Sequence, residues 1–184
     1  MESRVIFLDY DGVVNTPMWN EKGTRCRYGW PSDGKVNNFQ AVQWLSEACQ
    51  KFHYDIVVTS TWRTSQNYKE CLINGGLREG IKILGKTIRL TDEEDGPDFH
   101  GRRGREIQRY LDEHPEIKYY MILDDENVPI NDNQREHFIH TVDAQGGFNE
   151  EKFLEFEKRY MRDLGHGGSF WERKEKDYRK EIIE

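Results

Sequence analysis

A short apolar run that leads directly into two aspartates constrains this chain more than any other stretch. Residues 5–8 are Val-Ile-Phe-Leu, and so short a run, rich in β-branched and aromatic residues, predicts a buried strand. Asp9 and Asp11 follow, two residues apart, and Gly12 allows a sharp turn after them. Because neighbouring carboxylates repel each other, the pair indicates a nearby cation, proton or basic side chain. The alternative is an ordinary polar turn, since Asp and Gly are common turn residues.

The rest of the chain alternates strand-like runs with helical periodicity, which is typical of an α/β fold with a mainly parallel sheet. Further strands are predicted over residues 54–60, 119–123 and 138–142, with another short one within 81–90. Helices are predicted over residues 36–52, 61 to about 74, 106 to about 114, and 150–164. Asn149 is placed to cap the last helix. Residues 91–100 are acidic and contain a Gly-Pro pair, which predicts an exposed loop.

Length and composition favour a single domain. With 184 residues, the chain divides into a domain over residues 1–164, which includes a flap at about 15–35, and a charged tail or helix over 165–184. The formal charge of −7 argues against nucleic-acid or membrane binding through bulk charge. The three cysteines lack the spacing of a disulfide framework or zinc site, and no apolar run reaches the length of a membrane span. We therefore expect a cytoplasmic protein that does not bind membranes.

Polar groups that suit phosphate or metal chemistry follow three of the predicted strands. The C-terminal ends of parallel strands meet at one edge of a sheet, where ligands bind, so these groups should lie close together. Their convergence favours a functional site over simple turn chemistry. They are Asp9, Asp11, Thr59, Ser60, Asp124 and Asp125, together with an arginine cluster at Arg102, Arg103 and Arg105.

Four motifs follow one another along the chain: Phe7-Leu8-Asp9-x-Asp11-Gly12-Val13-x-Asn15, Ser60-Thr61-Trp62-Arg63, Arg103-Gly104-x-Glu106-Ile107 and Ile122-Leu123-Asp124-Asp125. In this order they resemble the haloacid dehalogenase (HAD) superfamily of phosphohydrolases, and more narrowly the HAD domains associated with RNA-repair proteins. The resemblance covers about residues 4–155 and implies a three-layer α/β/α Rossmann-like fold. Segments 12–54 and 64–102, where relatives insert cap domains, are too short for a full one, so we expect a capless phosphatase domain.

The resemblance implies a role for each of these side chains. Asp9 would be the nucleophile that forms an aspartyl-phosphate, and Asp11 would protonate the leaving oxygen and later activate water. Mg²⁺ would be held by Asp9, the Asp11 backbone carbonyl and Asp124, with Asp125 as a direct or outer ligand. Phosphate binding is assigned to Ser60, with Thr59 as the alternative, and to Arg103, where many relatives have lysine and where Arg102 or Arg105 is the alternative.

The implied function is that of a Mg²⁺-dependent phosphomonoester hydrolase. An uncapped site admits a phosphate at the end of a polymer, so the favoured substrate is a nucleic-acid terminal phosphate or a nucleotide. The alternatives are a phosphatase of a small phosphoester metabolite, or a non-catalytic module that binds a phosphorylated partner or assembles with other proteins through the charged tail. The sequence leaves the oligomeric state open.

Three further residues are expected to have structural roles. His100 and His114 fit surface or capping positions, because Asp11 already supplies the acid/base group. Trp62 is expected to pack where the chain leaves the sheet, and the alternative is stacking on a base.

Overall fold

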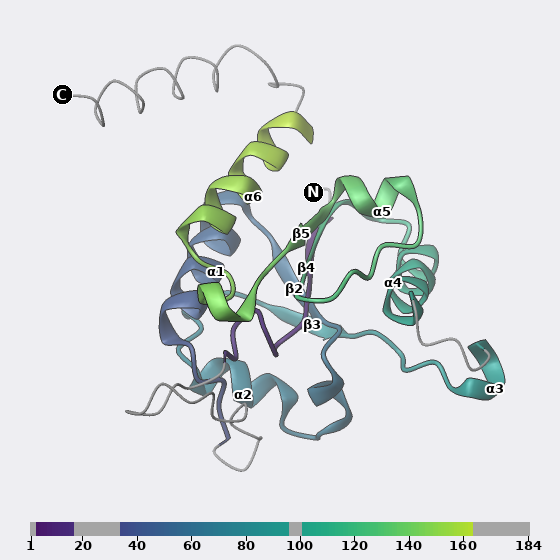
Figure 1. The fold of residues 1–184 in the computed structure, drawn as a ribbon, viewed down its shortest axis with the longest axis horizontal. Coiled ribbons are helices and arrows are strands. Elements are labelled where there is room, and N and C mark those ends of the chain that lie inside the picture. Colours follow the sequence, from purple (N-terminus) through teal and green to yellow (C-terminus); the bar gives the residue numbers. More distant parts are fainter. Residues whose placement is uncertain (1–2, 17–33, 96–100, 164–184) are drawn as a thin grey trace.

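The computed structural model describes residues 3–16, 34–95 and 101–163, which form a parallel sheet with helices on both faces (Figure 1). The strands lie in the order β3-β2-β1-β4-β5, and every neighbouring pair is parallel. From β1 the chain first builds one half of the sheet and then crosses to build the other half, so the strand order reverses beside β1. The strands are β1 (Ser3–Leu8), β2 (Asp55–Val58), β3 (Ile83–Lys86), β4 (Ile117–Asp124) and β5 (Phe138–His140).

Two layers of helices cover the sheet, which confirms the predicted three-layer α/β/α architecture (Figure 1). The helices α1 (Phe39–Phe52), α2 (Tyr68–Asn74) and α6 (Glu150–Asp163) pack on one face, and α4 (Arg102–Glu113) packs on the other beside the short α5 (Asp132–Glu136). Alternation along β1 explains the two cores, because Ile6 and Leu8 belong to the α1 side while Val5 and Phe7 belong to the α4 side.

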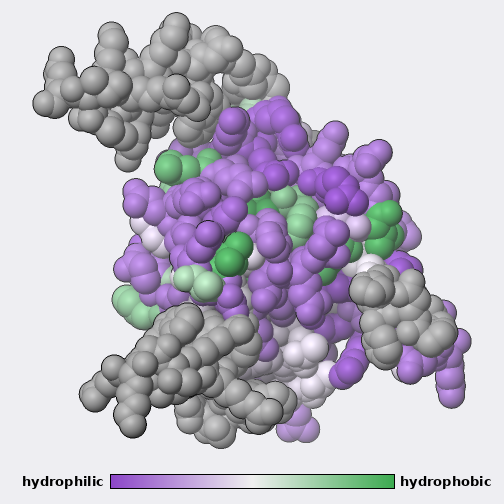
Figure 2. Space-filling view, in the orientation of Figure 1, coloured by the Kyte–Doolittle hydropathy of each residue, from purple (hydrophilic) through white to green (hydrophobic). Residues whose placement is uncertain are grey.

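Apolar periodicity and capping side chains account for the long helices. The side chain of Asn38 accepts a hydrogen bond from the Ala41 N–H at 3.0 Å at the start of α1. At the start of α6, Asn149 accepts one from the Lys152 N–H at 3.1 Å, which confirms the predicted cap. The view in Figure 2 shows a mostly hydrophilic surface with small separate apolar areas, because the apolar stripes of these helices face the sheet.

Several predicted boundaries are wrong. The first helix begins at Phe39 and not at residue 36, and the segment predicted as one helix from residue 61 is a 3₁₀ turn (Thr61–Thr64) followed by α2. The predicted loop at 91–100 contains the one-turn helix α3 (Asp92–Asp95). The arginine cluster lies inside the first turn of α4 and not before it, and α5 was not predicted because its five residues are too short for helical periodicity to register.

Three expectations fall on segments that the structure does not describe. Residues 17–33 of the predicted flap and residues 164–184, which contain the predicted tail, lie outside the described ranges, as does His100. Within those ranges, no helix combines the length and hydropathy that crossing a membrane requires.

Candidate active site

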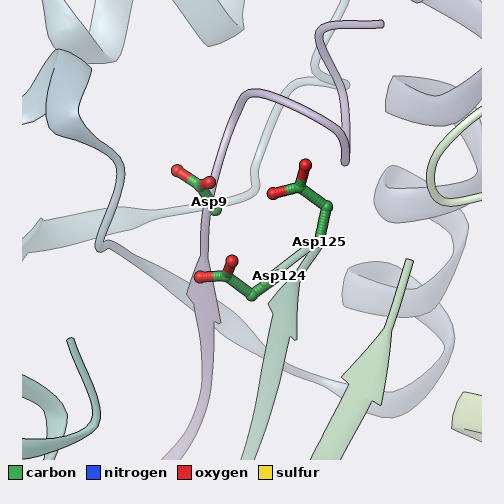
Figure 3. Close-up of side chains that lie close together, drawn as sticks. All are labelled: Asp9, Asp124 and Asp125. Carbon is green, nitrogen blue, oxygen red and sulfur yellow. The ribbon is translucent and has the colours of Figure 1, made fainter. Parts of the chain in front are cut away.

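The three strand-end aspartates Asp9, Asp124 and Asp125 form a cluster at the C-terminal edge of the sheet (Figure 3). Asp9 directly follows β1, and its N–H donates to the Leu123 carbonyl at 3.0 Å, so the β1–β4 ladder places it beside Asp124. One carboxylate oxygen from each aspartate lies within 4.8 Å of the other two. Asp9 and Asp124 are buried and Asp125 is half-buried, so most of the cluster is shielded from solvent.

Gly12 provides the space that the cluster needs. Its φ of +73° is in the left-handed region, and a Cβ atom there would lie 2.2 Å from the carboxyl group of Asp125. Any other residue at position 12 would therefore displace the Asp125 carboxylate or distort the turn after Asp11. The glycine of the Asp-x-Asp-Gly pattern thus makes room for Asp125 after the neighbouring strand β4, in addition to forming the turn after β1.

Arg103 supplies the positive charge of the cluster from the first turn of α4. Its guanidinium lies 2.8 Å from the Asp9 carboxylate and 2.6 Å from that of Asp124. Gly104 permits this approach, because a Cβ atom there would lie 2.2 Å from the Val128 carbonyl oxygen. The other two arginines lie elsewhere: Arg102 pairs with Asp92 of α3 at 2.6 Å, and a guanidinium nitrogen of Arg105 lies near Gly101. Of the three arginines, the structure brings only Arg103 to the aspartates.

Burial and nearby charges shift the pKa values of Asp124, Asp125 and Arg103. Burial, followed by the charge of Asp9, raises the pKa of Asp124 to about 8 and that of Asp125 to about 6. Burial alone would lower the pKa of Arg103, but the charges of Asp9 and Asp124 raise it above its ordinary value. Arg103 pairs with two of the three carboxyl groups, and a bound cation would favour the ionised form of all three.

The donor set fits a hard divalent cation. Its members are carboxylate oxygens from rigid strand ends, which are the ligands that Mg²⁺ prefers, and a bound cation would offset the burial and the Asp9 charge that raise the pKa values of Asp124 and Asp125. The Asp11 carboxylate does not belong to this group. It points instead toward Trp62 and Asn15. A metal contact through the backbone carbonyl of Asp11 stays a prediction.

Trp62 and Asn15 are the site residues whose role the sequence did not reveal. The indole Nε1 of Trp62 donates to Asp11 Oδ2 at 3.0 Å, and Asn15 Nδ2 donates to Asp11 Oδ1 at 2.6 Å. The Trp62 ring also packs edge-on against Tyr10, so the predicted packing role is present together with a polar one. Their only sequence signal was membership of the first two motifs, since neither spacing nor periodicity links residue 62 to residue 11.

Thr59 and Ser60 lie beside the cluster at the end of β2. The Thr59 N–H donates to the Leu8 carbonyl at 2.8 Å, which extends the ladder next to Asp9, while Ser60 Oγ accepts a hydrogen bond from the Trp62 N–H at 3.3 Å. Among the described residues, the buried hydroxyl of Thr59 has no hydrogen-bond partner. The backbone of Thr59 and Ser60 thus continues from β2 beside the end of β1, and which hydroxyl binds phosphate stays a prediction.

A buried ion pair holds this strand end in place. Arg63 pairs with Glu106 of α4 at 2.5 Å and donates to the carbonyls of Thr59 and Ser60. Glu106 in turn accepts the Leu90 N–H at 3.0 Å. Both charged side chains are almost completely buried. The pair fastens the end of β2 to the helix that carries Arg103.

Comparison with known proteins agrees with the geometry. Residues 5–153 match the family described as the HAD domain in Swiss Army Knife RNA repair proteins. No curated protein matches closely enough to count as a relative. The matched range begins within β1 and ends within α6, so it contains the aspartate cluster and Arg103. The chain therefore belongs to the family of HAD domains found in Swiss Army Knife RNA repair proteins, within the HAD superfamily of phosphohydrolases.

Proposed function

We propose that this protein is a Mg²⁺-dependent phosphomonoester hydrolase that works through an aspartyl-phosphate on Asp9. The observation that carries the proposal is the cluster itself: three carboxylates with oxygens within 4.8 Å of one another, two of which, Asp9 and Asp124, pair with the guanidinium of Arg103. A phosphoryl group is anionic, so a carboxylate can attack it only where its charge is offset and the reacting atoms are held in line. The burial of Asp9 and Asp124 supports such pre-organisation, because buried groups cannot rotate freely.

The proposed metal site consists of Asp9, Asp124 and Asp125, with the backbone carbonyl of Asp11. When bound there, Mg²⁺ would neutralise charge between the carboxylates and the phosphoryl oxygens. Arg103 contributes positive charge from the α4 side, and its planar guanidinium can offer two donors to phosphoryl oxygens. Ser60 or Thr59 adds a hydroxyl donor from the end of β2.

The two chemical steps use the two aspartates of the first motif. A carboxylate oxygen of Asp9 attacks phosphorus, the bond to the ester oxygen breaks, and Asp11 gives that oxygen a proton. Water then attacks the aspartyl-phosphate, Asp11 takes the proton from the water, and Asp9 is released with inorganic phosphate. The acid consumed in the first step is regenerated in the second, so the cycle is balanced.

The favoured substrate is a terminal phosphate of a nucleic acid or a nucleotide. Membership of a family of RNA-repair HAD domains supports this choice. The described parts of the connections after the first and second motifs, residues 12–16, 34–54, 64–95 and 101–102, contain α1, α2, β3 and α3, which make no separate domain by themselves. The proposed capless arrangement would leave the site open, which suits the end of a polymer better than a small metabolite.

Phosphate release separates these possibilities. We expect the wild-type protein to hydrolyse 4-nitrophenyl phosphate only with Mg²⁺, and Asp9→Asn to be inactive. Asp112→Asn, which changes an exposed carboxylate on α4, is the control and should keep wild-type activity. Absence of metal-dependent release from the wild-type protein would refute the proposed hydrolase activity and favour a binding module. Oligonucleotides with a 3′- or 5′-phosphate should then be better substrates than mononucleotides or sugar phosphates.

A further inference from the structure

Both oxygens of the Asp11 carboxylate are engaged by uncharged side-chain donors. Trp62 approaches Oδ2 at 3.0 Å and Asn15 approaches Oδ1 at 2.6 Å. An aspartate side chain rotates about two bonds, and two donors on different oxygens restrict both rotations. These two donors hold the Asp11 carboxylate without the guanidinium of Arg103, which pairs with Asp9 and Asp124 instead. The carboxylate of Asp11 is thus fixed separately from the metal cluster.

The Asn15 donor is fixed by its own contacts. Its Oδ1 accepts the Asn37 N–H at 3.2 Å, which leaves Nδ2 as the nitrogen that faces Asp11. The turn closes around it, since the Asn15 N–H donates to the Tyr10 carbonyl at 2.7 Å and the Gly12 N–H donates to the Asn15 carbonyl at 2.8 Å. Asn15 is fully buried. The amide therefore has little freedom to turn away from the carboxylate.

The Trp62 donor is equally constrained. The side chain is buried, and its ring packs edge-on against Tyr10 with the centroids 5.7 Å apart. Tyr10 is itself anchored, because its hydroxyl donates to the Tyr68 carbonyl at 2.7 Å. The Trp62 backbone N–H donates to Ser60 Oγ. The indole thus connects the end of β2 to the turn after β1.

We propose that Trp62 and Asn15 are positioning residues that hold Asp11 in the orientation from which it transfers its proton. This inference rests on the proposed hydrolase function. In the first step the P–O bond to the leaving oxygen breaks while Asp11 transfers a proton to that oxygen. An alkoxide leaving group needs this proton, whereas 2,4-dinitrophenolate is stable without it. A displaced Asp11 therefore penalises esters with poor leaving groups selectively.

The test compares two esters in wild-type protein and Trp62→Phe, using kcat/KM because it reports the steps up to release of the leaving group. For a simple alkyl phosphate we expect a loss of about 100-fold, the size of effect that follows from misplacing a catalytic group. For 2,4-dinitrophenyl phosphate the loss should be much smaller. Asn15→Ala should show the same selectivity. Equal losses on both esters would mean that Trp62 has only a structural role, and would overturn the inference.

Two further measurements guard against misfolding and against failure of the underlying function. Site-specific benzothienylalanine at position 62 keeps the ring shape but replaces the N–H by sulfur, and should reproduce the selective loss. In an Asp11→Ala background, Trp62→Phe should lower alkyl phosphate turnover little further, because it acts through Asp11. Full additivity there would contradict the inference. If wild-type protein is active with Mg²⁺ and Asp9→Asn is not, such a result would refute only the positioning role and leave the hydrolase proposal intact.

Discussion

The buried Arg63–Glu106 pair offers the sharpest prediction about stability. In Arg63→Met, the Glu106 carboxylate would stay buried, with the Leu90 N–H as its remaining hydrogen-bond donor among the described residues. The carbonyls of Thr59, Ser60 and Ile88 would also lose the hydrogen bonds that Arg63 now donates. Breaking a buried pair in this way costs about 3–5 kcal/mol, because one charge is left uncompensated.

Urea unfolding measures this cost. With a slope of about 2 kcal/mol per M, the loss moves the unfolding midpoint down by about 2 M. The double variant Arg63→Met/Glu106→Leu removes the uncompensated charge and should be more stable than Arg63→Met alone. Arg109→Met, which breaks an exposed i,i+4 pair with Glu113, is the matched control and should cost less than about 0.5 kcal/mol.

The outcome is decisive in either direction. A cost below about 1 kcal/mol for Arg63→Met would show that water reaches Glu106 and that the pair is not effectively buried. Additive losses in the double variant would show that the two side chains act independently. Either result would refute the conclusion that this pair fastens the end of β2 to α4.

Further predictions concern the aspartate cluster. Because Asp125 and Asp124 have raised pKa values in the folded protein, the folded state binds more protons than the unfolded chain, so metal-free stability should fall as the pH rises from about 4 to about 8. Melting temperatures should therefore show a Mg²⁺-induced increase that grows over this range; a constant increase would contradict the assignment. Arg103→Gln leaves the carboxylates without their positive neighbour, so we expect lower metal-free stability that Mg²⁺ restores, together with a loss of turnover, measured by melting and phosphate release. Gly12→Ala should weaken Mg²⁺ binding in calorimetric titration, because its Cβ overlaps the Asp125 carboxyl group; unchanged affinity would show that the turn adapts.

The comparison between sequence and structure separates local from non-local information. Apolar runs at 5–8 and 119–123 predicted strands correctly, because burial on both faces demands continuous hydrophobicity. The predicted approach of Asp9, Asp124 and Asp125 is also present, since parallel strands bring their C-terminal ends together. Helix boundaries were less predictable. Residues 61–64 and 92–95 form single turns, which are too short to leave a periodic pattern in the sequence.

The sequence alone determined the α/β architecture, the parallel sheet and the identity of the acidic strand ends, because these depend on hydrophobic periodicity and on which residues follow each strand. Only the tertiary structure decided that Arg103 and not Arg102 reaches the aspartates, that Gly12 makes room for Asp125, and that Trp62 contacts Asp11. These are contacts between residues far apart in the chain. Their geometry depends on how closely α4 and the turn after β1 pack against the sheet, and no local pattern encodes that distance.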